Sequence, residues 1–304
     1  MYGKSIKTNS YINKTYRIKK ELGSGGSGAV YLAWHARLNK LVVIKVVENC
    51  SPEAIKIHRN EVEALKNIRS LFIPQVLDFF IDDEKSFTIM EYIDGESFDK
   101  LLKSGVVFSQ PQIVSWYTQL ASTLELIHKL DICHRDIKPA NVMRMKTGDI
   151  CLIDFNSALV SGHNTGVISR SMGYASPEQY EYFKICKSKQ IEETVLHSEC
   201  PETVLLAGDC ITEPGLSMNI TTCADTQKIN WKSSDIYSLG ATIYHFLTGK
   251  RPPVKAGEVD RISKLKGYSS GLLKIIEKSM QSEPEKRFAS AESLCDSLWQ
   301  LELS

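Results

Sequence analysis

Residues 133–154 read CHRDIKPANVMRMKTGDICLID, and this stretch indicates both the fold and the chemistry of the chain. It places a carboxylate at Asp136, a lysine at Lys138 and an amide at Asn141 in one turn-rich segment. A β-rich segment then leads to a second carboxylate, Asp154. Phosphoryl transfer needs a carboxylate that accepts the proton of the attacking hydroxyl, a cation near the moving charge, and oxygen ligands for Mg²⁺. These four side chains supply that set.

The same string resembles the H-R-D-x-x-x-x-N catalytic loop and the D-F-G region of protein kinases. The resemblance implies that Asp136 is the catalytic base and that Lys138 stabilises charge on the γ-phosphoryl group. It implies Asn141 and Asp154 as the metal ligands. The D-x-K-x-x-N spacing is typical of the serine/threonine class.

A Gly/Ser hexamer, GSGGSG at 23–28, lies between two runs expected to be strands, 16–22 and 29–35. It fits the pattern G-x-G-x-x-G-x-V, which Val30 closes. Glycine permits a tight hairpin whose backbone can approach phosphates. By itself, a Gly/Ser hexamer is as typical of a flexible connector as of a phosphate-binding hairpin.

A lysine inside an apolar strand favours the phosphate hypothesis. Lys45 lies in LVVIKVV, residues 41–47, where a cation needs an anionic partner. In protein kinases this lysine holds the α- and β-phosphates and pairs with a glutamate on the next helix. We expect that helix over 52–69. Glu61 and Glu63 are both candidates, and Glu61 matches the family's Glu-x-x-x-Leu pattern better.

The resemblance also implies an adenine pocket formed by two further strands and an extended connector. Met90 is expected at the back of the pocket, and Glu91 and Ile93 are expected to offer backbone groups to adenine. Val43 stands where many kinases have Ala, so its extra methyl groups should narrow the roof slightly. The complete set of expected ATP-binding residues is Leu22, Gly23, Ser24, Gly25, Gly26, Ser27, Gly28, Val30, Val43, Lys45, Glu61, Met90, Glu91, Ile93 and Met143.

Helical patterns replace strand patterns after about Gly95. The expected fold is therefore α+β, and the resemblance implies a two-lobed protein kinase-like fold with a β-rich N-lobe and a helical C-lobe, and ATP·Mg²⁺ bound between the lobes. A long helix is predicted to begin at a Ser109–Gln112 capping box. Its buried stripe is expected at positions 113, 117, 120, 124 and 127. The predicted divisions are a 1–15 extension, a 16–94 N-lobe and a 95–304 C-lobe.

The segment after Asp154 resembles a kinase activation segment that ends at Ser176-Pro177-Glu178, in place of A-P-E. Thr165 and Ser169 are the phosphorylation candidates, and a phosphate there is expected to pair with Arg135 and raise activity. By the resemblance, Ser171 should contact the catalytic aspartate and lysine.

Two later residues are assigned by the same resemblance. Glu178 should pair with Arg287, and Asp235 should cap the backbone of the catalytic loop. Gly240 is expected to pack closely against its neighbours.

The chain departs from the family pattern in two places. Asn156 replaces the glycine of D-F-G, and because Asn tolerates left-handed backbone angles, we expect an effect on regulation more than on catalysis. A long insert at about 180–230 follows the activation segment and holds four of the eight cysteines. It has no C-x-x-C pair, so a surface loop that docks partners or substrates is favoured over a zinc site. The insert's cysteines are Cys186, Cys200, Cys210 and Cys223, and His197 lies among them.

Composition sets wider limits. The 304 residues are 42% hydrophobic and 24% charged with a net charge of +1, which is ordinary for a globular protein and gives no nucleic-acid signature. No apolar run is long enough for a membrane span, and we expect no signal peptide. Eight scattered cysteines favour a reducing cytoplasm.

The predicted function is transfer of the ATP γ-phosphoryl group to protein Ser/Thr hydroxyls, with autophosphorylation, by a bacterial-type serine/threonine protein kinase. Two other classes of protein are alternatives. A pseudokinase scaffold would bind partners without phosphotransfer, but such proteins usually lack a catalytic Lys, Asp or metal ligand. A small-molecule phosphotransferase would typically lack the activation segment.

Overall fold

The structure is a computed structural model of the whole chain. The structure describes residues 6–25, 28–48, 55, 59, 62–63, 65–83, 85–155, 157–160, 167–186, 216–219, 229–253, 262 and 265–302. By its internal contacts, the chain forms two compact units. The first unit contains residues 1–101 and 140–165, and the second contains 102–139 and 166–304.

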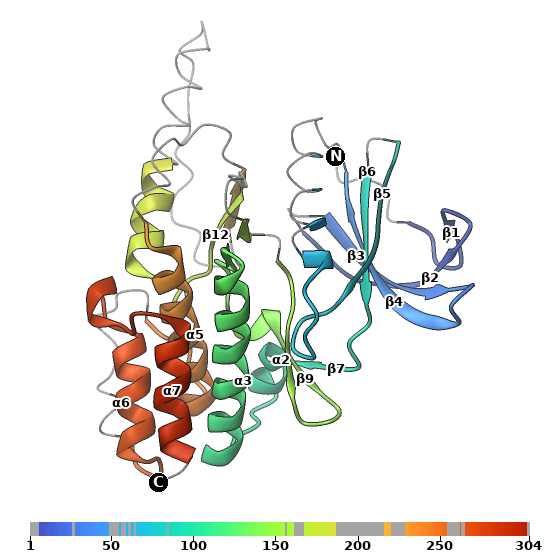
Figure 1. The fold of residues 1–304 in the computed structure, drawn as a ribbon. Coiled ribbons are helices and arrows are strands. Elements are labelled where there is room, and N and C mark those ends of the chain that lie inside the picture. Colours follow the sequence, from blue (N-terminus) through green and yellow to red (C-terminus); the bar gives the residue numbers. More distant parts are fainter. Residues whose placement is uncertain are drawn as a thin grey trace, which may run out of the picture. The chain divides into compact units, whose positions relative to one another are not determined.

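The first unit is built on a six-stranded sheet in which each strand is antiparallel to its neighbours (Figure 1). The order of strands across it is β1-β2-β3-β4-β6-β5. The strands predicted at 16–22, 29–35 and 41–47 are confirmed, and each extends one to three residues further at one end. The bounds are β1 Tyr11–Ile12, β2 Tyr16–Gly25, β3 Gly28–His35, β4 Lys40–Val47, β5 Val76–Asp82 and β6 Lys85–Glu91.

The alternation of side chains along β4 separates a core face from a second face. Val42, Ile44 and Val46 are at most 1% exposed and belong to the hydrophobic core of the sheet. Val43 and Lys45 point to the opposite face and are only half-buried. Because burial of the first face fixes the register, Lys45 is held on the second face.

A second, three-stranded sheet explains why residues 140–165 join the first unit. Its strand order is β10-β9-β7. The β9–β10 hairpin, from the middle of the chain, therefore pairs with β7, which directly follows the strands of the first sheet in sequence. A Cβ on Gly95 would lie 2.3 Å from the carbonyl oxygen of Arg144, so this pairing needs a glycine. The predicted lobe boundary near Gly95 stays a prediction. The strands are β7 Gly95–Ser97, β9 Val142–Met145 and β10 Ile150–Leu152.

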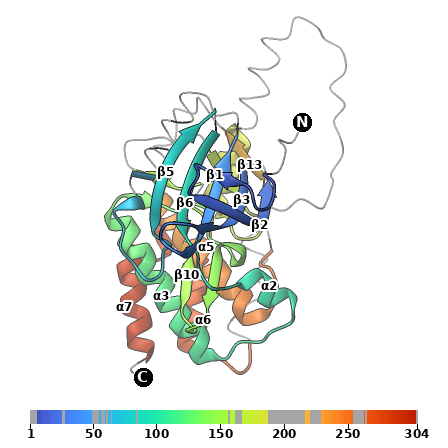
Figure 2. The same ribbon diagram turned by 90° about the vertical axis from the view of Figure 1, so that its right-hand side faces the viewer.

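The second unit is mainly helical, and Figures 1 and 2 show its helices packed along one another. The helix α3 contacts α5 and α7, and α6 contacts both α5 and α7. Residues 177–186 are also helical. None of the helices in the described ranges is both long enough and apolar enough to cross a membrane. The helix bounds are α3 Gln110–Lys129, α5 Trp231–Thr248, α6 Ser270–Ser279 and α7 Ala291–Glu302, and the short helix α2 Phe98–Lys103 contains residues of both units.

Shorter elements connect these helices. The 3-10 turns are η1 Pro139–Asn141 and η5 Pro284–Lys286. The remaining strands are β8 Ile132–Cys133, β11 Leu159–Val160, β12 Val167–Arg170 and β13 Leu216–Asn219.

The long helix predicted from its apolar spacing is confirmed as α3. The backbone N–H of Ser109 donates to Oε1 of Gln112 at 3.0 Å, as the capping box requires. The five predicted stripe positions, Ile113, Tyr117, Leu120, Leu124 and Ile127, are all at most 1% exposed.

The close packing expected at Gly240 is also confirmed. A Cβ on Gly240 in α5 would lie 2.7 Å from Cβ of Ser279 and 3.0 Å from Cγ of Met280. A Cβ on Gly271 in α6 would meet only Cδ1 of Leu301, at 2.6 Å, which is the mobile end of a side chain.

We therefore predict that Gly240→Ala lowers the free energy of unfolding by about 1–3 kcal/mol, because overpacking forces two helices apart. Gly271→Ala is the matched control: the Leu301 side chain can rotate away, and alanine favours the helix over glycine by about 0.5–1 kcal/mol. Chemical denaturation of both variants measures the difference. Equal stability of the two would contradict the packing argument.

Candidate active site

The second unit brings the catalytic-loop residues to one point. Nζ of Lys138 lies 2.8 Å from Oδ2 of Asp136. Oγ of Ser171 donates to Oδ1 of Asp136 at 2.6 Å, and Nζ of Lys138 donates to Oγ of Ser171 at 3.0 Å. The predicted contact of Ser171 with the aspartate and the lysine is therefore confirmed. The three groups form a closed triangle of carboxylate, ammonium and hydroxyl.

A buried carboxylate holds the backbone of this loop. Oδ2 and Oδ1 of Asp235 accept the backbone N–H groups of His134 and Arg135, each at 2.8 Å. Oδ2 also lies 3.0 Å from Nε2 of His128 on α3. Asp235 is 0% exposed, so these hydrogen bonds compensate for the burial of its charge. The predicted capping role of Asp235 is confirmed.

The loop needs this support because its backbone is strained at Arg135, where φ is +62°. The Arg135 side chain is 1% exposed, and its guanidinium carbon lies 5.2 Å from the centroid of the Trp231 ring, within range of a cation–π interaction. His134 is fully buried, and its Nδ1 accepts the backbone N–H of Asp136 at 3.3 Å, so its role is structural.

The pairing of Arg135 with an activation-segment phosphate stays a prediction. Thr165 lies outside the described residues, and the structure describes only the backbone of Ser169.

The residues that follow Ser171 are anchored within the second unit. The Gly173 N–H donates to the hydroxyl of Tyr180 at 3.1 Å. Gly173 has a φ of +83°, and a Cβ there would lie 2.3 Å from the carbonyl oxygen of Pro252, so only glycine fits. The hydroxyl of Tyr174 lies 2.6 Å from Nδ1 of His245. This part of the activation segment is therefore tightly fixed.

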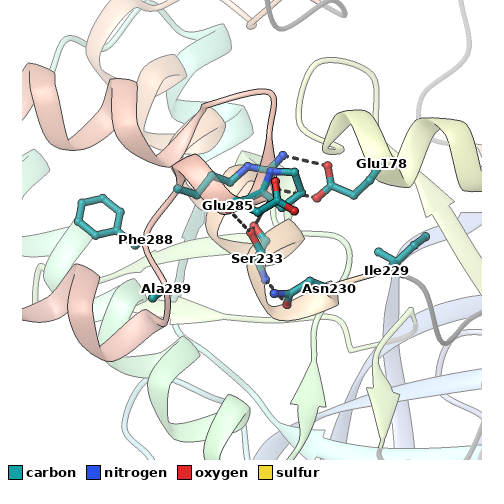
Figure 3. Close-up of a pocket in the computed structure, with 9 residues that line it drawn as sticks. Glu178, Ile229, Asn230, Ser233, Glu285, Phe288 and Ala289 are labelled. Atoms are coloured by element: carbon teal, nitrogen blue, oxygen red, sulfur yellow. Dashed lines mark hydrogen bonds and ion pairs between the residues drawn. The ribbon is translucent and has the colours of Figure 1, made fainter.

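The predicted pair of Glu178 and Arg287 is confirmed, and Figure 3 shows Glu178 with its dashed contacts beside a cavity of about 290 Å³. Nη1 and Nη2 of Arg287 donate to Oε1 and Oε2 of Glu178 at 2.6 and 2.9 Å. The remaining arginine donors reach the carbonyl oxygens of Gln281, Ser282 and Ser233. Because its polar groups bind one another, we assign this cluster a structural role.

In the first unit, Lys45 and Asp154 line one cavity of about 60 Å³. Thr88 and Met90 on β6 line it too, because they lie on the same face of the sheet as Lys45. Lys45 pairs with Thr88, and Val43 pairs with Met90, in the β4–β6 register. Lys45 on the sheet and Asp154 after β10, two predicted site residues far apart in the sequence, therefore line the same cavity.

The two expected metal ligands lie at the same end of a hairpin. Asn141 directly precedes β9 and Asp154 follows β10, and these strands are paired with Leu152 opposite Val142. The backbone N–H of Ile153 donates to the carbonyl oxygen of Asn141 at 2.8 Å. Asp154 has a φ of +66°, a conformation uncommon outside glycine and one that clusters at functional sites.

The glycine hairpin is described in part. Gly25 pairs with Gly28 where β2 meets β3, and a Cβ on Gly28 would lie 2.2 Å from the carbonyl oxygen of Val46. Val30 lies opposite Lys45 in the β3–β4 register. Three predicted residues, Gly26, Ser27 and Glu61, lie outside the described residues, so the Lys45–Glu61 pair stays a prediction.

The adenine contacts also stay predictions, with one restriction. The Glu91 backbone N–H already donates to the carbonyl oxygen of Gln75 at 2.9 Å, which leaves the Glu91 carbonyl as the group it can offer. Leu22, at 46% exposed, lies on β2 next to the hairpin, and Met143 lies on β9 opposite Cys151.

Sequence reasoning missed three residues of this site. Thr88 carried a signal, because it lies two residues before Met90 and therefore on the same face of a strand. His128 carried one too, because it lies four residues after Leu124 on the buried stripe of α3. Nothing in the sequence pointed to Trp231 as a partner of Arg135.

A group of three buried side chains, His128, Cys133 and Asp235, has its donor atoms within 4.8 Å of one another. Metal binding needs a thiolate, and burial, followed by the nearby Asp235 carboxylate, raises the pKa of the Cys133 thiol. Asp235 is also committed to the loop backbone. We therefore interpret the group as structural support for the catalytic loop.

Comparison with known families agrees with this geometry. Residues 16–193 match the model of the protein kinase domain. The chain belongs to the protein kinase domain family. The matched residues include the glycine hairpin, Lys45, the catalytic loop and Ser176-Pro177-Glu178.

Curated relatives of the kinase domain include several bacterial proteins. The chain is 26% identical over 306 residues to a probable serine/threonine-protein kinase of Clostridium acetobutylicum, covering 94% of this chain and 40% of the relative. It is 28% identical over 310 residues to serine/threonine-protein kinase D of Synechocystis, covering 96% and 53%. Serine/threonine-protein kinase PknA of Nostoc is 26% identical over 303 residues, with 94% and 47% covered. The chain thus spans about half the length of these relatives.

The Glu178–Arg287 pair generates a stability prediction for the kinase domain. Arg287→Lys removes the bidentate contact and leaves Glu178 and several carbonyl oxygens without their donors, so we expect a loss of about 3–5 kcal/mol in the free energy of unfolding. Lys286→Met is the control, because the neighbouring Lys286–Glu283 pair is exposed and such pairs contribute about 0–1 kcal/mol. Urea denaturation compares the two. A loss of similar size in both would contradict the assigned role.

Proposed function

We propose that this chain is an ATP-dependent protein serine/threonine kinase, which transfers the γ-phosphoryl group of ATP to Ser or Thr hydroxyls of proteins, its own included. The observation that supports the proposal is the triangle of Asp136, Lys138 and Ser171. A serine hydroxyl already donates to Asp136 at 2.6 Å, so this carboxylate is accessible to the kind of group it would have to activate. Names of the bacterial relatives agree with this activity.

In the proposed reaction, Asp136 accepts a hydrogen bond from the acceptor hydroxyl and orients its oxygen. That oxygen forms a bond to the γ-phosphorus while the bond from the γ-phosphorus to the bridging β–γ oxygen breaks. The hydroxyl proton passes to Asp136, and ADP leaves with the bridging oxygen. Lys138, 2.8 Å from Asp136, neutralises charge on the transferred group, which electrostatic stabilisation requires.

The proposal assigns the nucleotide to residues of the first unit. Lys45 would bind phosphate oxygens at the cavity that it shares with Asp154, and the half-buried faces of Val30 and Val43 would contact adenine. Asn141 and Asp154 fit Mg²⁺, because an amide oxygen and a carboxylate are hard oxygen ligands that can share one ion with phosphates. When bound, Mg²⁺ neutralises phosphate charge.

The compartment and partners are part of the same proposal. Cys133, Cys151 and Cys295 are buried cysteines that form no disulfide within the described residues, which fits a reducing cytoplasm. The expected partner is a protein with an accessible Ser or Thr, with no nucleic acid involved. The insert at about 180–230 is proposed as a docking element for partners or substrates. Of its zinc-candidate residues, Cys200, Cys210, Cys223 and His197 lie outside the described residues.

The proposal predicts that Asp136→Asn lowers phosphoryl transfer by orders of magnitude, since an amide cannot take up the hydroxyl proton. Asp131→Asn is the matched control, because its exposed carboxylate pairs with Lys232 on the surface. The assay uses radiolabelled ATP with the purified chain and a generic basic protein. Label that persists in Asp136→Asn would remove the mechanism. No label with wild type, despite nucleotide binding, would favour a pseudokinase scaffold, and labelled metabolites alone would favour a small-molecule phosphotransferase.

A second prediction concerns the metal. Asp154→Asn should raise the Mg²⁺ concentration needed for half-maximal ATP binding by tenfold or more, roughly, because one charged ligand is lost. Asp149→Asn, in the turn of the β9–β10 hairpin, should leave the magnesium dependence unchanged. Calorimetric titrations with ATP at several magnesium concentrations measure this. An unchanged magnesium dependence in Asp154→Asn would contradict the ligand assignment.

A further inference from the structure

The insert contributes one described strand, and that strand pairs with the activation segment. The strand β13 is antiparallel to β12, with Ser169 opposite Ser217. The other three pairs in register are Val167 with Asn219, Ile168 with Met218 and Arg170 with Leu216. The protein kinase resemblance accounts for the activation segment but not for the insert. The ladder therefore joins the insert, which departs from the usual family pattern, to the segment next to the catalytic base.

The ladder ends directly beside the catalytic triangle. β12 finishes at Arg170, and the next residue is Ser171, which is 6% exposed and bonded to both Asp136 and Lys138. Because only one peptide bond separates Arg170 from Ser171, the direction of β12 determines where the Ser171 hydroxyl lies. A change of conformation over β12 would therefore move a group that contacts the catalytic base.

The chain beyond Ser171 is already held by other contacts. The backbone N–H groups of Tyr174 and Ala175 donate to the carbonyl oxygen of Ser171 at 3.0 and 2.9 Å. Gly173 packs against Pro252, and Tyr180 accepts its N–H. Ser171 thus has an anchored segment after it and the β12–β13 ladder before it. Of these two supports, the ladder is the one that the insert supplies.

A two-stranded ladder of this length is also suited to be reversible. Extended backbone needs hydrogen-bond partners, and β13 offers them to β12 within the same chain. Isolated two-stranded pairings are marginally stable in water, so modest changes shift the balance between paired and unpaired forms. A phosphate at Ser169, in the middle of β12, would act on this equilibrium.

We propose that β13 is a built-in strand partner of the activation segment, which keeps β12 extended and the Ser171 hydroxyl on Asp136. The insert thereby promotes phosphoryl transfer to protein. This inference rests on the proposed function for its consequence, but the pairing itself can be tested without any activity.

The first test is a cross-link in the full chain. Residues directly opposite in an antiparallel ladder have Cα atoms about 4.5–5.5 Å apart, which suits a disulfide. Ser169→Cys with Ser217→Cys should therefore form a disulfide under mild oxidation, identified by mass spectrometry of the linked peptides. Ser169→Cys with Met218→Cys is the control, because a shift of one residue places the second thiol on the other face. Absence of the first cross-link, or equal yields of both, would overturn the pairing.

The second test breaks the ladder. In an antiparallel pair, alternate residues exchange hydrogen bonds, so one of two adjacent N–H groups on β13 donates to β12. Replacing both Ser217 and Met218 by Pro removes that donor, and we expect protein phosphorylation to fall about fivefold or more, the effect of losing one hydrogen bond. Ser217→Thr with Met218→Val keeps both N–H groups and should retain wild-type activity. ATP affinity should be unchanged in both, because the proposed nucleotide residues belong to the first unit.

The outcomes separate the two proposals. If the cross-link forms but the proline variant keeps or exceeds wild-type phosphorylation, the activating role of β13 is wrong and the proposed function stands. If the wild-type chain transfers no phosphate, the proposed function fails, and the cross-link still decides whether the strands pair.

Discussion

The catalytic loop depends on one buried carboxylate, that of Asp235. It accepts two consecutive backbone N–H groups, those of His134 and Arg135, at 2.8 Å. This contact stabilises the left-handed backbone at Arg135, where φ is +62°. Because the next residue is Asp136, the position of the proposed base follows from a hydrogen bond made by a helix about a hundred residues later. A charged acceptor is suited to this task, since charge-assisted hydrogen bonds are about twice as strong as neutral ones.

Ser171 is held in place by contacts on both sides of it in the chain. Its hydroxyl completes the triangle with Asp136 and Lys138, and the segments on either side of it are fixed by unrelated means. After Ser171, the chain is fixed by the tight packing of Gly173 against Pro252. Before Ser171, β12 is paired with β13 over four residues. A rigid anchor and a marginal one on opposite sides of a single contact allow that contact to be adjusted. The insert, which has no counterpart in the family pattern, supplies the marginal anchor.

Much of the site was predictable because kinase chemistry concentrates its residues in short strings. The loop 133–141 and the strand around Lys45 could be identified from their residue types and spacing. The long helix α3 was predictable because its apolar period matches 3.6 residues per turn. Thr88 could have been predicted from the two-residue period of a strand, and His128 from the 3.6-residue period of α3. Trp231 was not, because the stacking of a ring on a guanidinium group leaves no pattern in the sequence.

The sequence by itself determined the family, the strand and helix types and the candidate residues, because these depend on side-chain identity and local periodicity. Only the tertiary structure decided which distant groups meet: Lys45 with Asp154 at one cavity, Asp235 with the catalytic loop, and β12 with β13. Hydrogen bonds between residues far apart in the chain form only when the packing of the whole unit holds them in place. A linear pattern therefore names such groups without showing which of them pair.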